Sequence, residues 1–465
     1  MLNKYHSLIL AVLLSPFLFS CTSSEEKDTF AYFGGHIKNP KGDIIIFLKD
    51  SKAIDTIRLG IHNTFLKKFK NLEEGLYTFK HGLEFQYVYL EPTDSILIHL
   101  NTWDFDENLV FSGRGSEKNE FLVNALLNIE NDEKIIGSYY RFEEEEFSTK
   151  LDSMLQLREA MLSQFKSSVE DISVGFIHLA EASIKFPFLR RKEAYSYFHK
   201  HALKLNDFPT LSEHFYDYRK HVNLNDTALF SFYPYTNYVT NYIYNAGYKK
   251  ITSHKECQVL ATNMLEVIAT NITQGDFKDK LLKSVLVNDF LKGNISCSFT
   301  DENLKIFLDN CDNIDFRKEI EVLIKESKLI KNNQPLSPFN LVNSANEIIS
   351  VGEIIKNKPT VLYFWSTEFM SPKYLSMRLS YFKKRFPSIS FVGIQINDDF
   401  IITNKRLKQH LGAQYKIPKN GLAHSYFSSR YPRSIIINKE GTVINGFAYF
   451  NSKFFSPQLE RLINN

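Results

Sequence analysis

The feature that most constrains the fold is a strand–helix–strand pattern near the C-terminus. Val361–Phe364 is an apolar run, and Ile389–Ile396 is mostly apolar and lacks strict alternation, as expected of a strand that is buried on both faces. Between them, Ser371–Phe386 has apolar residues at helical spacing and ends in three basic residues, which suit a helix C-terminus. Pro387 then stops the helix. This pattern predicts a βαβ unit with parallel strands and a right-handed connection.

The residues around this unit resemble the TlpA-like thioredoxins of the redoxin family. Asn357–Ser366 is similar to the Lys-Pro, apolar strand, Phe-Trp run of that family, with Trp365 at the tryptophan. Tyr431–Gly441 resembles a second landmark, in which a cis-proline loop enters a strand that ends in a hairpin turn, and Pro432 matches the cis-proline. The resemblance covers roughly residues 336–465 and implies a thioredoxin-like α/β domain there.

The two active-site cysteines of that family fall on residues without a thiol. The matching positions here are Phe369 and Pro372. Thiol–disulfide exchange needs an attacking thiolate, usually activated by a helix N-terminus, and a second thiol that resolves the mixed disulfide. The chain keeps the helix start, where Ser371 is typical of an N-cap rather than of a catalytic serine. The sequence therefore predicts no catalytic residue and no redox activity at this site.

A groove beside the cis-proline can survive the loss of the thiols. The resemblance implies that backbone groups there pair with an extended polypeptide, and Arg433 would add a positive charge at the edge. The residues predicted to form this groove are Trp365, Phe369, Met370, Ser371, Pro372, Pro432 and Arg433. The first interpretation is thus a redox-inactive chaperone or adaptor that binds a polypeptide or a partner protein of the cell envelope.

The remaining cysteines leave a second interpretation open. Cys257, Cys297 and Cys311 form no Cys-x-x-Cys motif, and zinc needs closer Cys/His pairs than these. We expect buried apolar residues or one structural disulfide, with Cys297 and Cys311 as the candidate pair, and no metal or cofactor. In the alternative, a TlpA-like oxidoreductase uses one of these cysteines near the groove. Fold alone does not decide between the two.

The N-terminus predicts a lipoprotein. Residues 1–20 have a short basic start and an apolar run that is too short to span a bilayer, as in a secretory signal peptide. Leu18–Cys21 resembles the bacterial lipobox, which implies cleavage before Cys21 and lipid on that residue. Residues 21–29 would then be a polar tether. We expect a lipid-anchored protein at the outer membrane of the bacterial envelope, on its periplasmic or surface face.

The rest of the chain predicts a multidomain α+β protein. Residues 30–115 hold short β-rich runs between turn residues, which favour a β-sandwich-like domain, and this part resembles the strand-rich domain that precedes TlpA-like thioredoxins. Residues 116–335 show helical periodicity, and 336–465 form the thioredoxin-like domain. With 56 Lys and Arg against 53 Asp and Glu, the net charge is +3, which gives no case for nucleic-acid binding.

An aromatic run in the middle of the chain supports a third interpretation. Phe230–Tyr244 is rich in Phe and Tyr and either packs in the core or forms a sugar- or peptide-binding face. The absence of a charged cluster in the run favours the core. In the third interpretation, the β-rich and helical domains bind such a ligand and the thioredoxin-like domain is a scaffold.

Overall fold

The computed structural model describes residues 28–82, 84–103, 108–251, 256–292, 301–366, 370–396, 411–426, 433–450, 452 and 454–464. The predicted signal peptide and Cys21 lie outside these residues. The chain divides into two compact units, the first extending to Glu120 and the second containing residues 121–465 with the short pieces 50–52 and 83–85. The helical segment and the C-terminal sheet share the second unit, so the boundary predicted at 335 does not separate these units.

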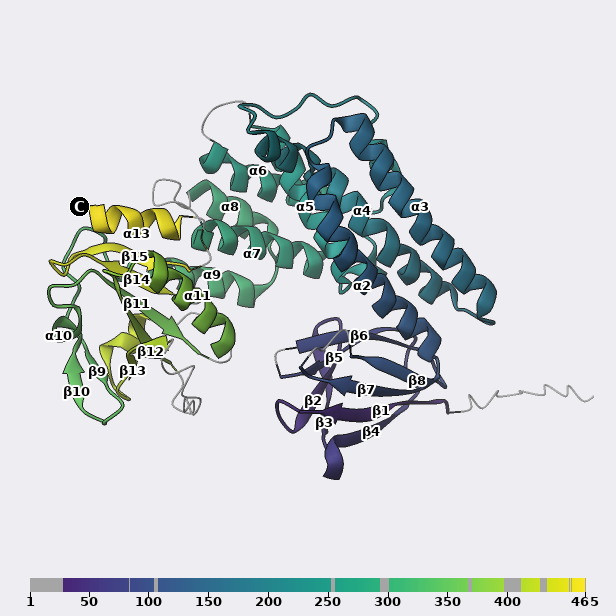
Figure 1. Cartoon of the computed structure of the whole chain (residues 1–465), viewed down its shortest axis with the longest axis horizontal. Coiled ribbons are helices and arrows are strands. Elements are labelled where there is room, and N and C mark those ends of the chain that lie inside the picture. Colours follow the sequence, from purple (N-terminus) through teal and green to yellow (C-terminus); the bar gives the residue numbers. More distant parts are fainter. Residues whose placement is uncertain are drawn as a thin grey trace, which may run out of the picture. The chain divides into compact units, whose positions relative to one another are not determined.

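The first unit contains two four-stranded sheets (Figure 1). Their orders are β4-β1-β7-β8 and β3-β2-β5-β6, with β1 and β7 parallel. The Phe33 ring lies 5.3 Å from Phe47 and 5.4 Å from Phe79, so side chains of both sheets meet in one aromatic core, as in a β-sandwich. The strands are β1 (Phe30–Lys38), β2 (Ile44–Lys49), β3 (Lys52–Arg58), β4 (Thr64–Lys70), β5 (Gly75–His81), β6 (Glu84–Leu90), β7 (Ser95–Asn101) and β8 (Val110–Arg114).

The start of the first long helix belongs to this unit. The buried amide of Asn119 accepts a hydrogen bond from Tyr89 N at 2.6 Å and donates one to Tyr89 O at 2.9 Å. Lys118, also buried, forms ion pairs with Glu91 at 2.9 Å and Asp94 at 3.2 Å. These contacts explain why the unit extends to Glu120, beyond the boundary predicted at 115.

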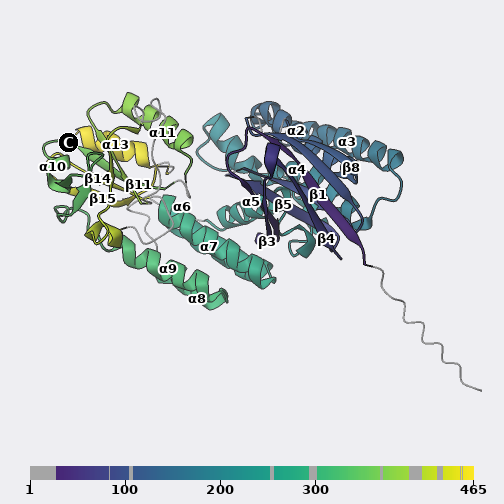
Figure 2. The ribbon, with the colours of Figure 1, turned by 90° about the horizontal axis from the view of Figure 1, so that it is seen from below.

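The second unit begins with helices (Figures 1 and 2). One of them starts at Val174 and continues through Pro187, and the aromatic run forms another that begins at Tyr233. The helices are α2 (Ser116–Tyr139), α3 (Glu144–Ser168), α4 (Val174–Leu203), α5 (Tyr233–Lys249), α6 (Glu256–Asn271), α7 (Gly275–Lys292), α8 (Asp301–Asn310) and α9 (Ile314–Ser327).

A seven-stranded mixed sheet follows, in the order β10-β9-β13-β12-β11-β14-β15. The predicted βαβ unit is confirmed, because β11 and β12 are parallel and α11 connects them. The predicted hairpin is confirmed by the antiparallel pairing of β14 with β15, and β14 also pairs antiparallel with β11. The elements are β9 (Asn340–Val342), β10 (Ile348–Ser350), α10 (Val351–Ile355), β11 (Thr360–Trp365), α11 (Pro372–Arg385), β12 (Ser390–Gln395), β13 (Gln414–Lys416), β14 (Ser434–Ile437), β15 (Val443–Ala448) and α13 (Phe455–Asn464).

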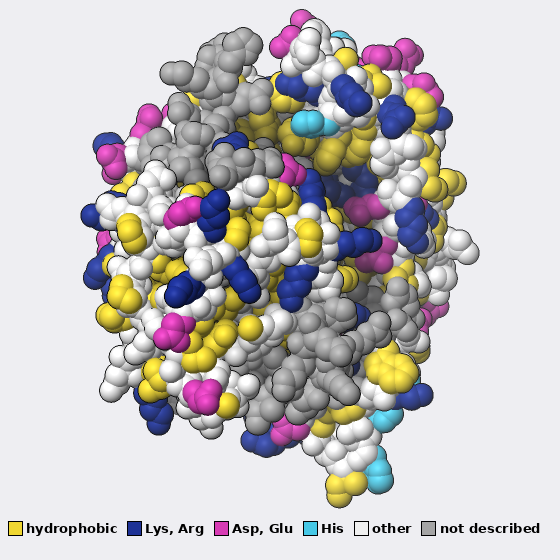
Figure 3. Space-filling view, turned by 60° about the vertical axis from the view of Figure 1, so that its left-hand side comes forward, with side chains coloured by type: hydrophobic (Ala, Val, Ile, Leu, Met, Phe, Trp, Pro, Cys, Tyr) yellow, Lys and Arg dark blue, Asp and Glu magenta, His cyan; other side chains and the backbone are white. Residues whose placement is uncertain are grey.

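The described surface carries charges of both signs. Figure 3 shows Lys and Arg side chains interspersed with Asp and Glu on the face that it presents, as expected of a chain with a net charge of +3. Among the described helices, none combines the length and the apolar composition that a bilayer-crossing segment needs.

Candidate functional site

Strand β11 carries the predicted site and is buried on both faces. Val361, Tyr363 and Trp365 belong to one hydrophobic cluster, which includes residues of α11 and α13. The alternate residues Leu362 and Phe364 belong to a second cluster with residues of β9, β12 and β14. Successive side chains of a strand point to opposite faces, so the two clusters lie on the two sides of the sheet. Strand β12, for which burial on both faces was predicted, contributes Phe391 to the first cluster and Ile394 to the second, which confirms that prediction.

Trp365 belongs to the core, where it takes part in a small polar network. Its Nε1 donates a hydrogen bond to Gln414 Oε1 at 2.9 Å. The Gln414 amide nitrogen donates to Tyr363 Oη at 2.7 Å and to Leu411 O at 2.9 Å. Burial raises the pKa of Tyr363, so the phenol stays neutral and donates to Leu411 O at 2.8 Å. The indole of Trp365 therefore stabilises the fold and is not a free wall of a groove.

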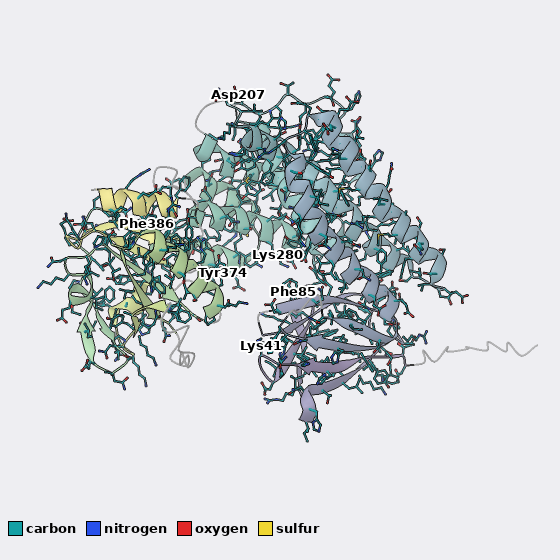
Figure 4. The ribbon with its side chains drawn as sticks, viewed as in Figure 1. Lys41, Phe85, Asp207, Lys280, Tyr374 and Phe386 are labelled. Carbon is teal, nitrogen blue, oxygen red and sulfur yellow. The ribbon has the colours of Figure 1, made fainter. Side chains whose placement is uncertain are left out.

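The helix start after β11 has the geometry predicted for an N-cap. Ser371 adopts extended backbone angles and its Oγ accepts a hydrogen bond from Tyr374 N at 3.1 Å. Pro372 occupies the first turn, where its missing N–H costs nothing. Tyr374 and Phe386, labelled in Figure 4, mark the two ends of α11. No nucleophile stands at positions 369 and 372, since the residues there are Phe and Pro.

The prediction that Arg433 lies at the edge of a groove is wrong, because its side chain is buried. It is 1% exposed, and its guanidinium donates to Gly446 O at 2.8 Å and Tyr426 O at 2.7 Å. Burial lowers its pKa to about 10, although the negative charge of Glu326 on α9 acts in the opposite direction. A buried charge needs partners inside the protein. Arg433 has two main-chain carbonyl oxygens as acceptors and the negative charge of Glu326 on α9. Arg433 is a structural residue.

The seven predicted groove residues separate into two that the structure does not describe and five that are buried or form the start of α11. Phe369 and Pro432 lie outside the described residues, so the predicted cis-proline stays a prediction. Met370 is buried in the same cluster as Trp365, and Ser371 is engaged as an N-cap. The exposed apolar side chains next to this site belong instead to the outer face of α11, where Tyr374, Met377 and Tyr381 are 36%, 60% and 48% exposed.

The cysteines give no sign of a relocated active site. Cys311 is a free, fully buried thiol, and burial raises its pKa to about 11. At neutral pH such a group is thiolate in only about one molecule in ten thousand, so it is a poor nucleophile. Because Cys311 is free, the structure does not contain the predicted pairing with Cys297, which lies outside the described residues. The side chain of Cys257 is also outside them.

The aromatic run lies mainly in the core, as favoured, but part of it lines a cavity. Tyr235 and Tyr238 are fully buried, whereas Tyr244 on the same helix is 36% exposed and lines a cavity of about 670 Å³. No pattern in the sequence pointed to this cavity, because the segment from 204 to 216 that completes it is far from the run in sequence. Among the described residues, no cluster of His, Cys, Asp and Glu has the arrangement of a metal site.

No model of a known protein family matches the sequence, and no curated protein shows significant similarity to it. Solved thioredoxin-like structures match part of the chain. A protein assigned as a thiol-disulfide oxidoreductase from Bacteroides vulgatus is 19% identical over 29% of this chain and 99% of its own, with a TM-score of 0.23. A protein assigned as the thiol:disulfide interchange protein DsbE from Chlorobium tepidum is 15% identical over 29% of this chain and 99% of its own, with a TM-score of 0.24. A secreted disulfide oxidoreductase of Mycobacterium tuberculosis is 19% identical over 27% of this chain and 96% of its own, with a TM-score of 0.22. At these identities and TM-scores, the matches carry no argument about the function of this chain.

Proposed function

We propose that the chain is a redox-inactive thioredoxin-like lipoprotein of the bacterial cell envelope that binds extended polypeptide, as a chaperone or adaptor. The observation that carries this proposal is the helix start after β11. It keeps the position of a thioredoxin active site, but a serine hydroxyl caps it and no thiol is present at positions 369 and 372. A protein that keeps the strand and helix without the nucleophile retains a scaffold for binding but not the chemistry of exchange.

The outer face of α11 is the surface that we assign to the polypeptide. Tyr374, Met377 and Tyr381 are spaced by three and four residues, so they lie on one face of the helix, and all three are exposed. Methionine and tyrosine suit a surface that accepts varied apolar side chains. The helix contains five basic residues and no acidic one, which favours a polypeptide with acidic residues near its apolar side chains.

The first experiment measures disulfide reduction by the mature chain without Cys21, beside a variant with Cys257, Cys297 and Cys311 changed to Ser. Equal background rates in the two proteins are expected, because no thiol stands at the helix start. Activity that is present in the parent and lost in the variant would point to a relocated thiol and overturn the redox-inactive assignment.

The second experiment measures binding of a permanently unfolded, carboxymethylated polypeptide by fluorescence anisotropy. Met377→Glu should weaken binding several-fold, because it places a carboxylate in the apolar face of α11. Leu157→Glu is the matched control, since Leu157 is 65% exposed on α3 and lies outside the assigned surface. Binding that is unaffected by Met377→Glu, or weakened equally by both substitutions, would exclude α11 as the site.

A separate experiment tests the lipid anchor that would hold the protein in the cell envelope. Metabolic labelling with a radioactive fatty acid in a bacterial host should label the full-length chain and leave a Cys21→Ala variant unlabelled, because Cys21 would carry the lipid. Labelling of both proteins would refute the assignment of Cys21 as the anchor without bearing on polypeptide binding.

A further inference from the structure

The helical segment contains a cavity that the proposed function does not use. Its volume is about 670 Å³, within the range of pockets that hold small organic ligands. The walls come from α4, from the connection between α4 and α5, and from α5 and the residues after it. Asp207, labelled in Figure 4, marks the start of the connecting segment that lines the cavity. All the lining residues belong to the second unit and are described.

The lining of this cavity is strongly aromatic. The Tyr248 ring lies 5.7 Å from Tyr197 and 5.6 Å from Phe208, both in tilted arrangements. These three rings come from α5, α4 and the connecting segment, and they pack against one another as one aromatic wall of the cavity. Rings held in this way offer flat apolar faces to a ligand. The aromatic lining residues are Tyr197, Phe198, Phe208, Tyr216, Tyr244 and Tyr248.

A buried ion pair forms one side of the cavity and is fully engaged within the protein. Glu193 on α4 is paired with Arg219. Its carboxylate also accepts hydrogen bonds from Tyr218 Oη at 2.8 Å and Asn245 Nδ2 at 2.7 Å. A carboxylate with these partners has little capacity left for a ligand, so its role is to hold the connecting segment against α4 and α5.

Lys249 is the single cation in the lining, and the described residues offer it no carboxylate partner. Its Nζ lies 3.8 Å from the centroid of the Tyr216 ring, and the guanidinium of Arg219 lies 4.0 Å from the same centroid. Burial has the largest effect on the pKa of Lys249 and lowers it, and the positive charge of Arg219 lowers it further. The negative charge of Glu193 raises it, but by less. Glu193 neutralises Arg219, so the Lys249 ammonium is the charge of this wall that is left to attract an anionic group, while the carboxylate of Glu213 lies elsewhere in the lining.

We propose that this cavity binds a small organic anion with a flat apolar body, such as an aromatic carboxylate or sulfonate. The apolar ring packs against the wall formed by Tyr197, Phe208 and Tyr248, and the anionic group pairs with the Lys249 ammonium. The size of the cavity, its aromatic walls and the unpaired lysine carry this assignment together. The site is independent of the α11 surface.

The test uses two fluorescent probes that share one apolar body. 8-Anilinonaphthalene-1-sulfonate carries an anionic group, and N-phenyl-1-naphthylamine does not. The wild-type mature chain should bind the sulfonate saturably and roughly tenfold more tightly than the neutral probe, because a charge-assisted contact contributes on that scale. A general hydrophobic surface would prefer the neutral probe. Absence of saturable sulfonate binding, or tighter binding of the neutral probe, overturns the proposal.

Variants locate the site. Lys249→Met should weaken the sulfonate about tenfold and leave the neutral probe unchanged. The matched control is Lys250→Met, since Lys250 is paired with Glu266 at 3.0 Å and does not line the cavity. Phe208→Ala, in the connecting segment, should weaken both probes, with circular dichroism confirming that the variants are folded. Equal effects of the two lysine substitutions, or no effect of Phe208→Ala, would place the probes elsewhere and refute the site.

Discussion

At the residue scale, the hydrogen bonds around Trp365 depend on Gly393, which has no side chain. The amide of Gln414, which holds the indole and the phenol of Tyr363, occupies the space beside Gly393. A Cβ on Gly393 would lie 2.3 Å from Gln414 Oε1. A side chain at position 393 would therefore displace Gln414 and disrupt its hydrogen bonds with Trp365 and Tyr363.

Gly393→Ala should lower the free energy of unfolding by about 2–4 kcal/mol, because displacing Gln414 leaves the buried donor of Trp365 without its acceptor. Urea denaturation measures the change. Gly137→Ala is the control, since a Cβ there meets no atom and alanine favours the interior of α2. A Gly393→Ala protein as stable as the wild type would mean that Gln414 is not fixed in this position.

Asp289 should make part of the stability depend on pH. Burial raises its pKa to about 6, against a hydrogen bond from Asn303 that acts in the other direction. The folded-state pKa lies above the unfolded value of about 3.9, so its favourable contribution is complete below pH 4 and is lost as the pH rises through 6. Asp289→Asn should therefore stabilise the protein by about 2 kcal/mol at pH 8 and by little at pH 4.

Urea denaturation at the two pH values measures this difference. Asp309→Asn is the control, because Asp309 is exposed and paired with Lys305 on the surface of α8. A gain from Asp289→Asn that is equal at both pH values would contradict the raised pKa.

At the element scale, the sequence predicted the strands and helices near the site better than the exposure of their side chains. The alternation-free run of β12 and the basic end of α11 identified both elements, and Ser371 was assigned as an N-cap from its position alone. Trp365 and Arg433 were placed in a groove by resemblance. Sequence gives no direct signal of burial for such residues, because the partners Gln414 and Glu326 are distant in the chain and become neighbours only on folding.

Helix α4 shows a second limit of sequence-based prediction. A proline inside a helix lacks an N–H and crowds the preceding turn, so it normally ends or kinks the helix. In the structure, Pro187 is buried inside α4, and Arg191 Nη1 donates to its carbonyl oxygen at 2.6 Å. Packing of buried residues on both sides of the proline compensates for the lost hydrogen bond. Tertiary contacts of this kind are not visible in local propensity.

The N-cap of α11 gives a prediction for this element. Ser371→Ala should cost about 1 kcal/mol of stability, because the Tyr374 N–H loses its acceptor, whereas Ser371→Asp should retain the stability. Thermal and urea unfolding of the two variants measure the difference. Equal losses in both would mean that the hydroxyl has a role other than capping.

At the scale of the whole molecule, the first compact unit should fold by itself only if it includes the start of α2. The main-chain groups of Tyr89 are paired by the Asn119 amide, so a fragment that ends at residue 115 leaves them without partners. A fragment of residues 28–121 should give a cooperative thermal transition, and one of residues 28–115 should be several kcal/mol less stable or unfolded. Equal melting temperatures of the two fragments would refute the contribution of α2.

The buried guanidinium of Arg433 also has a consequence for the order of assembly. Arg433 precedes β14, one of the last strands to be synthesised, yet the charge that favours its ionised form is on α9, which is made earlier. The segment that follows α9 supplies Asn332, whose Oδ1 accepts a hydrogen bond from Gly446 N at 2.8 Å. The final hairpin thus packs against residues that the chain has already produced. A C-terminal fragment that begins at residue 336 would have to bury the Arg433 cation without them.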